Sequence, residues 1–187
     1  LSLGLKLGKE AEEVDMNDAK GSVLVVDDEE SIRNILSYAL QKTGYVCELA
    51  KRGDEALQSI LMKDFDIALL DIDMPGMSGI EVLSQLINFR PDISVVMVTA
   101  IQDTKIAVEA MKLGAYDYVI KPFNLDDLGL RVEKALERRR LVLENKRYHL
   151  RLEQKVENQA GQIQQYYQEA LQALVREQIA VQKLEDV

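Results

Sequence analysis

The 187-residue sequence has few of the residues on which several classes of protein depend. It contains one cysteine and no tryptophan, and its only histidine is His149. A single cysteine excludes a disulfide within the chain and fits a reducing cytoplasm, where we expect the protein to reside. The place of Cys47 beside Val46 and Leu49 predicts an ordinary strand residue rather than a reactive thiol.

Long apolar segments and an excess of positive charge are also missing. No stretch approaches the roughly 20 apolar residues that cross a bilayer, and the N-terminus lacks the layout of a secretion signal. The net charge is −9, and residues 1–124 carry all of it, since residues 125–187 hold 11 basic and 11 acidic side chains. An acidic globular part repels nucleic acid and anionic lipid, so we expect neither a nucleic-acid partner nor membrane insertion.

Apolar runs of strand length are present between residues 21 and 124, and stretches of helical periodicity separate them. The runs cover residues 22–27, 45–49, 66–71, 93–99 and 116–120. Five strands that alternate with helices within about 100 residues predict an α/β fold. Its sheet should be parallel, with helices on both faces.

Three parts are expected along the chain. Residues 1–20 are polar and charged, which predicts a flexible N-terminal lead-in, and residues 21–137 form the α/β domain. Residues 138–187 contain no proline and are rich in Glu, Gln, Lys, Arg, Leu and Ala, which is the composition of a helix. We therefore expect a helical extension after the domain.

An apolar seam follows this extension, with positions alternately four and three residues apart. The positions are Val156, Ala160, Ile163, Tyr167, Ala170, Leu174, Glu177, Val181 and Leu184. Such a seam, apolar except at one glutamate, predicts a coiled coil and therefore a homodimer. Parallel pairing, antiparallel pairing and folding back near Gly161 all remain open.

The seam fits less well before residue 156. Continued in the same register, it contains Arg139, Lys146, His149 and Glu153. A shifted stripe of apolar residues is formed by Leu136, Leu143 and Leu150. The sequence therefore allows a stutter near residues 150–156, where the heptad pattern changes register.

Two of the apolar runs end at carboxylates. The first run leads directly into Asp27 and Asp28, and Asp71 follows the third run just before a Met-Pro-Gly turn. In α/β proteins the carboxyl ends of parallel strands form the edge of the sheet that binds ligands. Clustered carboxylates are hard oxygen ligands suited to Mg²⁺, with Mn²⁺ as an alternative, and Asp71 would remain free to attack a phosphorus atom as a nucleophile.

Two further polar residues follow the last two runs. Thr99 ends the fourth run and Lys121 follows the fifth, so both are expected at the same edge of the sheet. A hydroxyl and a fixed cation are suited to bind the oxygens of a phosphoryl group. Each signal is weak alone, but the whole ordered set is very specific: an acidic pair, Asp-x-x-Met-Pro-Gly, Thr-Ala and Lys-Pro-Phe, each at a strand terminus.

With these motifs in place, residues 22–137 resemble the receiver domain of two-component response regulators. The resemblance implies a five-stranded, doubly wound, flavodoxin-like parallel sheet of strand order 2-1-3-4-5, and a sensor histidine kinase or phosphotransfer protein as partner. It implies that Asp71 is the phosphoacceptor and that Mg²⁺ is held by Asp27, Asp28, Asp71 and the backbone carbonyl of Asp73. The side chain of Asp73 either adds negative potential beside the site or points to solvent.

The same resemblance implies roles for residues near the last two strands. Thr99 and Lys121 would bind the phosphoryl group, and the peptide bond before Pro122 would be cis. Tyr118 matches an aromatic residue that turns inward when the threonine moves, so Thr99 and Tyr118 would form a switch. The chain would then be no enzyme beyond its own phosphorylation and dephosphorylation.

Two other functions compete with this interpretation. Asp71-Ile72-Asp73 also fits the start of haloacid-dehalogenase-like phosphatases, although in that family the acidic pair follows the nucleophile and a cap encloses the substrate. A structural coiled-coil protein with an inert head is the second alternative. His149 is interpreted as a solvated or seam histidine, and residues 138–140, three arginines, as a solvated helix face.

No effector domain is recognisable in the sequence after the receiver-like part. Residues 139–146 and the charged helix that follows resemble the connector between receivers and HD-GYP phosphodiesterase domains. The single histidine excludes an HD-type metal centre in this chain. Whether an effector follows Val187 in the natural gene product, and which kinase and target the protein serves, stay open.

Overall fold

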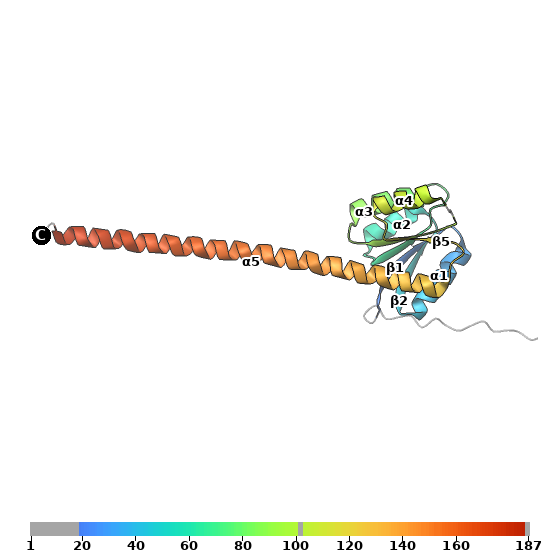
Figure 1. The fold of residues 1–187 in the computed structure, drawn as a ribbon, viewed down its shortest axis with the longest axis horizontal. Helices are drawn as coiled ribbons and strands as arrows, with labels where there is room; N and C mark the ends of the chain where they lie inside the picture. The colour runs from blue at the N-terminus through green and yellow to red at the C-terminus, as the bar shows by residue number, and fades with distance from the viewer. Residues whose placement is uncertain (1–18, 101–102, 186–187) are drawn as a thin grey trace, which may run out of the picture. The chain divides into compact units, whose positions relative to one another are not determined.

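The computed structural model describes residues 19–100 and 103–185, with side chains described up to residue 176. Most of the expected N-terminal lead-in, and the seam positions Glu177, Val181 and Leu184, therefore lie outside the described side chains. The elements in chain order are β1 (Gly21–Val26), α1 (Glu30–Lys42), β2 (Tyr45–Ala50), α2 (Gly53–Met62), β3 (Ile67–Leu70), α3 (Gly79–Phe89), β4 (Ser94–Thr99), α4 (Thr104–Leu113), β5 (Asp117–Ile120) and α5 (Leu125–Glu185) (Figure 1).

The five strands form one parallel sheet in the order β2-β1-β3-β4-β5, which confirms the predicted fold class. Val23 of β1 pairs with Ile67 of β3, and Ile67 pairs with Ser94 of β4. The order reverses between β1 and β3, so the first and third strands lie side by side at the centre of the sheet. This is the switch point at which open α/β sheets bind ligands.

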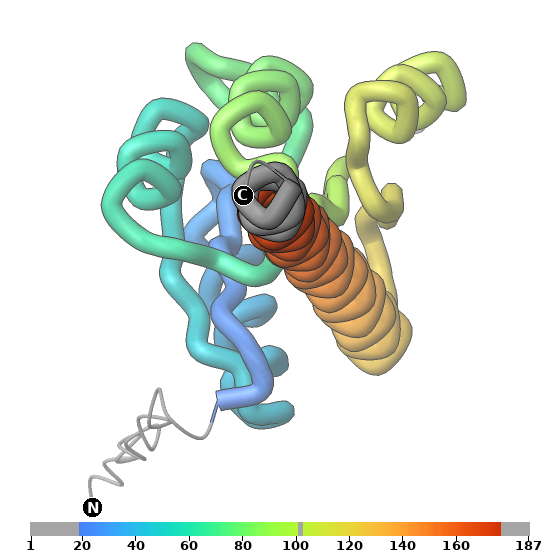
Figure 2. Tube along the Cα trace, turned by 90° about the vertical axis from the view of Figure 1, so that its left-hand side faces the viewer, coloured from blue at the N-terminus to red at the C-terminus, as the bar shows by residue number. Residues whose placement is uncertain are grey.

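Two apolar clusters cover the two faces of the sheet and explain why the strands are apolar throughout. Leu24 and Leu70 belong to one cluster, under α2, α3 and α4, whereas Val25 and Leu69 belong to the other, under α1 and the start of α5. Successive side chains of a strand point to opposite faces, so a strand covered on both sides needs apolar residues at every position. Figure 2 shows α2, α3 and α4 together along one face.

The first turns of α5 are part of this packing. Leu128 and Val132 are buried against the sheet, and the hydroxyl of Ser94 donates a hydrogen bond of 3.1 Å to the carbonyl oxygen of Ala135. Burying a side chain such as Leu128 stabilises the fold by about 1.5–3 kcal/mol. The α/β domain thus needs the beginning of the long helix as its fifth covering helix.

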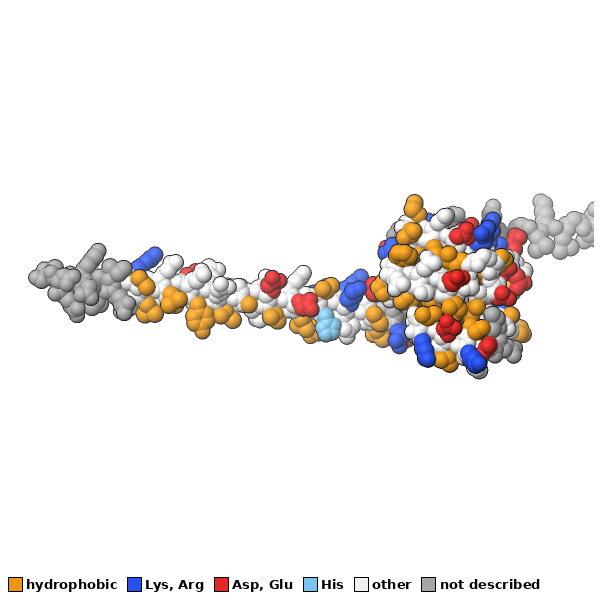
Figure 3. All heavy atoms as spheres, turned by 90° about the horizontal axis from the view of Figure 1, so that it is seen from above, with side chains coloured by type: hydrophobic (Ala, Val, Ile, Leu, Met, Phe, Trp, Pro, Cys, Tyr) orange, Lys and Arg blue, Asp and Glu red, His pale blue; other side chains and the backbone are white. Residues whose placement is uncertain are grey.

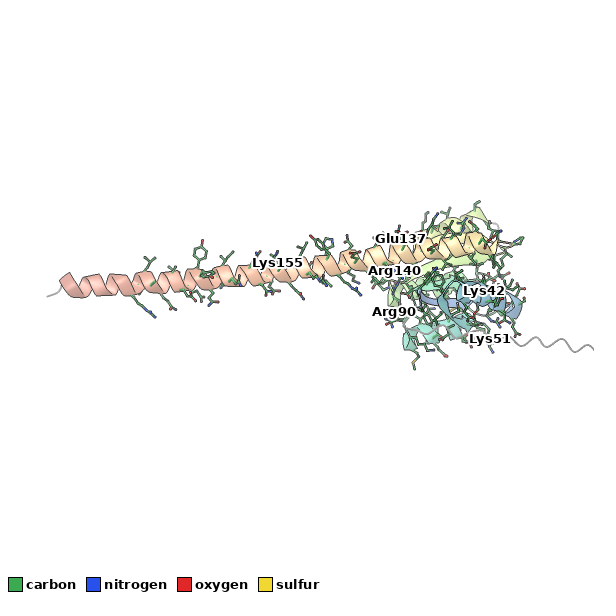
Figure 4. The ribbon with its side chains drawn as sticks, turned by 90° about the horizontal axis from the view of Figure 1, so that it is seen from below. Lys42, Lys51, Arg90, Glu137, Arg140 and Lys155 are labelled. Atoms are coloured by element: carbon green, nitrogen blue, oxygen red, sulfur yellow. The ribbon has the colours of Figure 1, made fainter. Side chains whose placement is uncertain are left out.

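The interpretation of residues 138–140 as a solvated helix face is wrong for Arg139. Its guanidinium forms an ion pair with Asp66, and only 16% of its side chain is exposed. Asp66 also accepts hydrogen bonds from the amide (2.8 Å) and the hydroxyl (3.1 Å) of Ser22. Arg140, labelled in Figure 4, donates to the carbonyl oxygen of Lys20 at 2.6 Å. A local sequence pattern could not reveal these partners, because they are far away in the chain.

The chain divides into two compact units, residues 1–141 and residues 142–187. The second unit is helical as far as it is described, and α5 continues through Gly161 without a break, so the chain does not fold back there. Within the described residues, no helix is both long and apolar enough to cross a membrane.

Cys47 is the ordinary strand residue that was expected, since burial raises the pKa of its thiol to about 11.

Candidate functional site

Two buried aspartates meet at the carboxyl edge of the sheet. Asp27 follows β1 and is 1% exposed, and Asp71 follows β3 and is 4% exposed. Their amides continue the sheet hydrogen bonding, with Asp27 donating to Ala50 at 3.2 Å and Asp71 donating to Val26 at 2.9 Å. Because β1 and β3 are neighbours in a parallel sheet, both side chains emerge at the same edge.

Lys121 lies between these carboxylates. Its Nζ is 2.6 Å from Asp27 Oδ2 and 2.8 Å from Asp71 Oδ2, and Glu29 Oε1 is 4.0 Å away. The lysine follows β5, its amide donates to the carbonyl oxygen of Thr99 at 2.8 Å, and the next peptide bond, before Pro122, is cis as the resemblance implied. The ammonium group of Lys121 therefore contacts Asp71 and Asp27, which lie 50 and 94 positions before it in the chain.

Burial and charge act in opposite directions on these groups. Burial raises the pKa of Asp27, although hydrogen bonds from Lys121 and from the amide of Glu29 partly offset it. For Lys121 burial by itself lowers the pKa, but the hydrogen bonds and negative charges of Asp27 and Asp71 outweigh it, so the net shift is upward. The ammonium form of Lys121 is therefore held at neutral pH.

Backbone groups and one arginine hold the acidic loops in place. Asp27 Oδ1 accepts from the amide of Glu29 at 2.9 Å, and Asp71 Oδ1 accepts from the amide of Asp73 at 3.3 Å. Arg33 donates to the carbonyl oxygens of Asp27 (2.7 Å) and Asp28 (2.9 Å). Arg33 was not predicted from the sequence, although a basic residue one turn into the helix that follows an acidic run was a usable signal.

Gly79 brings α3 close to the loop of Asp71. Its amide donates to the carbonyl oxygen of Ile72 at 3.0 Å, and a Cβ added to it would collide with the carbonyl oxygen of Asp71. The helix begins here because Ser78 caps it, with a reciprocal hydrogen bond from Ser78 to the side chain of Glu81. Glycine is therefore required at position 79 for close approach of two backbones.

Three of the predicted metal ligands come together. Oxygen atoms of Asp27, Asp28 and Asp71 lie within 4.8 Å of one another, with Asp28 exposed and the other two buried. Three carboxylates beside one ammonium leave excess negative charge, and such hard oxygen donors suit Mg²⁺, which keeps several waters as ligands. The fourth predicted ligand was the carbonyl of Asp73, whose side chain is exposed; its ligation stays a prediction.

The two residues predicted to form a switch lie near this edge. Thr99 ends β4 and is fully buried, and Tyr118 of β5 is half-buried against the cluster that contains Leu24 and Leu70. Burial raises the pKa of the Tyr118 phenol, and the charges of Asp103 and Asp71 raise it further. The phenol is therefore neutral at physiological pH, which would suit the inward turn predicted for this side chain.

The arrangement favours attack by a carboxylate on an anionic group. Hydrogen bonds hold Asp71 in place, and Lys121 partly neutralises its charge. The Lys121 ammonium is also close enough to pair with oxygens of the anionic group that gain negative charge during the attack. Asp27 and Asp28 add two carboxylates for a divalent cation, which would neutralise an incoming anion.

His149 is exposed on α5, where its ring meets that of Tyr148 edge-on at 6.5 Å, and it belongs to no cluster of possible metal ligands among the described residues.

Comparisons with known proteins agree with this geometry. The family model of the response regulator receiver domain matches residues 23–133. The regulatory protein AtoC of Escherichia coli K12 is 39% identical over 127 residues, covering 68% of this chain and 28% of AtoC. The transcriptional regulatory protein ZraR of Klebsiella oxytoca is 43% identical over 126 residues, which are 67% of this chain and 28% of ZraR. The chain thus spans about a quarter of the length of the curated relatives it matches.

Solved structures show the same likeness. A CheY-like receiver domain protein from Methanospirillum hungatei JF-1 has a TM-score of 0.62 and 32% identity, covering 64% of this chain and 95% of that one. NtrX from Brucella abortus has a TM-score of 0.65 and 34% identity, covering 67% of this chain and 29% of NtrX. TrrA from Thermotoga maritima, solved with Mg²⁺ and BeF, has a TM-score of 0.57 and 37% identity, covering 61% of this chain and 97% of TrrA.

Proposed function

This chain belongs to the response regulator receiver domain family, and on that premise we propose that it accepts a phosphoryl group on Asp71. The donor would be the phosphohistidine of a sensor histidine kinase or phosphotransfer protein. An Asp71 carboxylate oxygen attacks the phosphorus, the P–N bond of the donor breaks, and its electron pair returns to the imidazole. The product is an acyl phosphate on Asp71, which water later hydrolyses.

One observation carries this proposal: a single ammonium group contacts both buried aspartates. Lys121 Nζ lies 2.8 Å from Asp71 Oδ2, close enough to accompany that oxygen through the transfer and then to pair with the phosphoryl oxygens. Thr99 is proposed as the hydroxyl that donates to the same group. An ordinary surface ion pair would be exposed and would not join three separate strands.

Mg²⁺ is proposed as the cofactor, with Asp27, Asp28 and Asp71 as ligands. The cation supplies charge that neutralises the approaching phosphoryl group. Asp27 must be ionised to bind it, and burial already raises the pKa of that carboxyl. Metal affinity should therefore fall as the pH approaches the raised pKa of Asp27 from above, because protons compete with the metal for this ligand.

The output is proposed to pass through α5. Thr99 and Tyr118 would move on phosphorylation and shift α4, β5 and the start of α5, and a homodimer formed by the rest of the helix would carry the change onward. Exposed apolar side chains beyond residue 141 support the homodimer. Relatives named as DNA-binding regulators match over only 25% of their length, so DNA binding is not assigned to this chain.

The phosphorylation test uses the full chain with Mg²⁺ and acetyl phosphate. The wild type should gain one phosphoryl group that is stable in acid and labile to hydroxylamine, detected by intact-protein mass spectrometry. Asp71→Asn should gain none, whereas Asp64→Asn is the matched control, an exposed carboxylate seven residues away that should keep phosphorylation. Incorporation into Asp71→Asn at the wild-type level would reject the assignment. Steady turnover of small phosphomonoesters would instead favour a phosphatase.

A further inference from the structure

Beyond residue 141, α5 exposes many large apolar side chains. Figure 3 shows most of them along one side of the helix. Val156 is 65% exposed, Ile163 is 56% exposed and Tyr167 is 69% exposed. Since a lone helix of this kind is marginal in water, these side chains need a partner that covers them.

The positions of these residues repeat after 18 residues, which is about five complete turns of an α-helix. Residues 142, 145, 149, 152 and 156 therefore lie on the same face as residues 160, 163, 167, 170 and 174. We define the α5 stripe by these positions: Val142, Asn145, His149, Leu152, Val156, Ala160, Ile163, Tyr167, Ala170 and Leu174. Eight of the ten are apolar, and the two polar ones are neighbours in the stripe.

The α5 stripe departs from an unbroken heptad seam at one place. An unbroken seam would place Lys146 and Glu153 in the contact, whereas the α5 stripe has Asn145 and Leu152. The difference arises because two four-residue steps follow one another, from Leu152 through Val156 to position 160. A repeat of 18 residues combines a 7-residue and an 11-residue period, whose opposite supercoils cancel, so two paired helices would be nearly straight.

We propose that the α5 stripe binds the α5 stripe of a second copy of this chain, in parallel and in register. The inference rests on the homodimer of the proposed function and names the surface that forms it. Position Asn145 then faces its own counterpart, and so does position His149. A polar pair within an otherwise apolar contact selects one register at a cost in stability.

Charge and flanking residues support a second copy as the partner. Between Val156 and Val175 the only charged residues are Glu157 and Glu169, so little like-charge repulsion opposes self-association. Tyr166, 72% exposed, and Leu171, 60% exposed, are five residues apart and flank the stripe on opposite sides. In a parallel pair such flanking positions of the two helices contact each other, so they extend the apolar contact.

The test is disulfide crosslinking of the full chain in a Cys47→Ser background. Two pairs of adjacent positions give matched comparisons: Asn145→Cys with Lys146→Cys, and Leu152→Cys with Glu153→Cys. We expect Asn145→Cys and Leu152→Cys to form the disulfide-linked dimer several-fold faster than their neighbours. Arg147→Cys, on the opposite face of the helix, measures the background rate.

The outcomes separate this inference from the homodimer on which it rests. Faster crosslinking at positions 146 and 153 would overturn the α5 stripe in favour of the unbroken seam. Background rates at all four positions, in a chain that sediments as a dimer, would overturn parallel pairing. A chain without added cysteines that sediments as a monomer at tens of micromolar would reject the homodimer itself.

Discussion

The carboxyl edge of the sheet and the second half of α5 depart in opposite ways from the usual distribution of residues. At the edge of the sheet, Asp27, Asp71 and Lys121 hold charges that are largely removed from water. Along α5, side chains such as Ile163 and Tyr167 hold apolar surface in water. Each departure costs free energy in the isolated chain, so each indicates a binding partner that the isolated chain does not contain.

The missing component differs between the two regions. Buried carboxylates that outnumber their ammonium partner attract a cation and an electrophile, so the edge of the sheet is suited to chemistry. Exposed apolar side chains of one face attract another apolar face, so the helix is suited to assembly. Arg139 lies just before the boundary of the two units, where its ion pair with Asp66 holds the last turn of α5 that packs on the sheet.

The largest effect is expected from removing the charge that joins the two aspartates. Lys121→Ala should slow phosphorylation by acetyl phosphate on the order of 1,000-fold, because a fixed donor to the developing phosphoryl charge is lost. Initial rates measured by mass spectrometry give the ratio. Lys134→Ala, an exposed lysine of α5, should leave the rate unchanged. A Lys121→Ala rate within twofold of the wild type would mean that the buried lysine has no part in the transfer.

An intermediate effect is expected from placing a charge in the apolar face of α5. Ile163→Lys should weaken the homodimer roughly 100-fold, because two isoleucine side chains, each contributing about 1.5 kcal/mol when covered, are replaced by facing charges. Sedimentation equilibrium measures the dissociation constant. Gln162→Lys adds the same charge one residue away, outside the α5 stripe, and should have little effect. Equal weakening by both variants would show that net charge, and not the face, controls assembly.

The smallest effect is expected at Arg139, just before the boundary of the two compact units. Arg139→Gln should lower the free energy of unfolding by about 1–3 kcal/mol, because Asp66 keeps its hydrogen bonds to Ser22 but loses its charged partner. Urea denaturation of the full chain measures it. Arg138→Gln is the neighbouring control: its guanidinium lies 5.8 Å from the ring centre of Tyr116, a contact that contributes about 0.5–1 kcal/mol at most. Equal losses of unfolding free energy in the two variants would mean that the ion pair between Arg139 and Asp66 does not stabilise the fold.

Much of the α/β domain could be predicted because its signals are local. The five strands lie within a residue or so of the predicted runs, since a strand covered on both faces must be apolar throughout. Parallel strands also place their carboxyl ends at one edge, so Asp27, Asp71 and Lys121 could be expected together before any distance was known. Arg33 and the close approach of Gly79 were missed, because side-chain reach and backbone contact leave no periodic signal.

The sequence by itself determined the order of elements, the helical nature of α5 and the residue types that converge at the sheet edge. Periodicity and strand termini encode these features within a few neighbouring residues. Only the tertiary structure decided that one ammonium bridges Asp27 and Asp71, and that Arg139 turns back to Asp66, 73 positions away. Such contacts depend on how distant segments pack, and the same local sequence would allow Arg139 to remain in solvent.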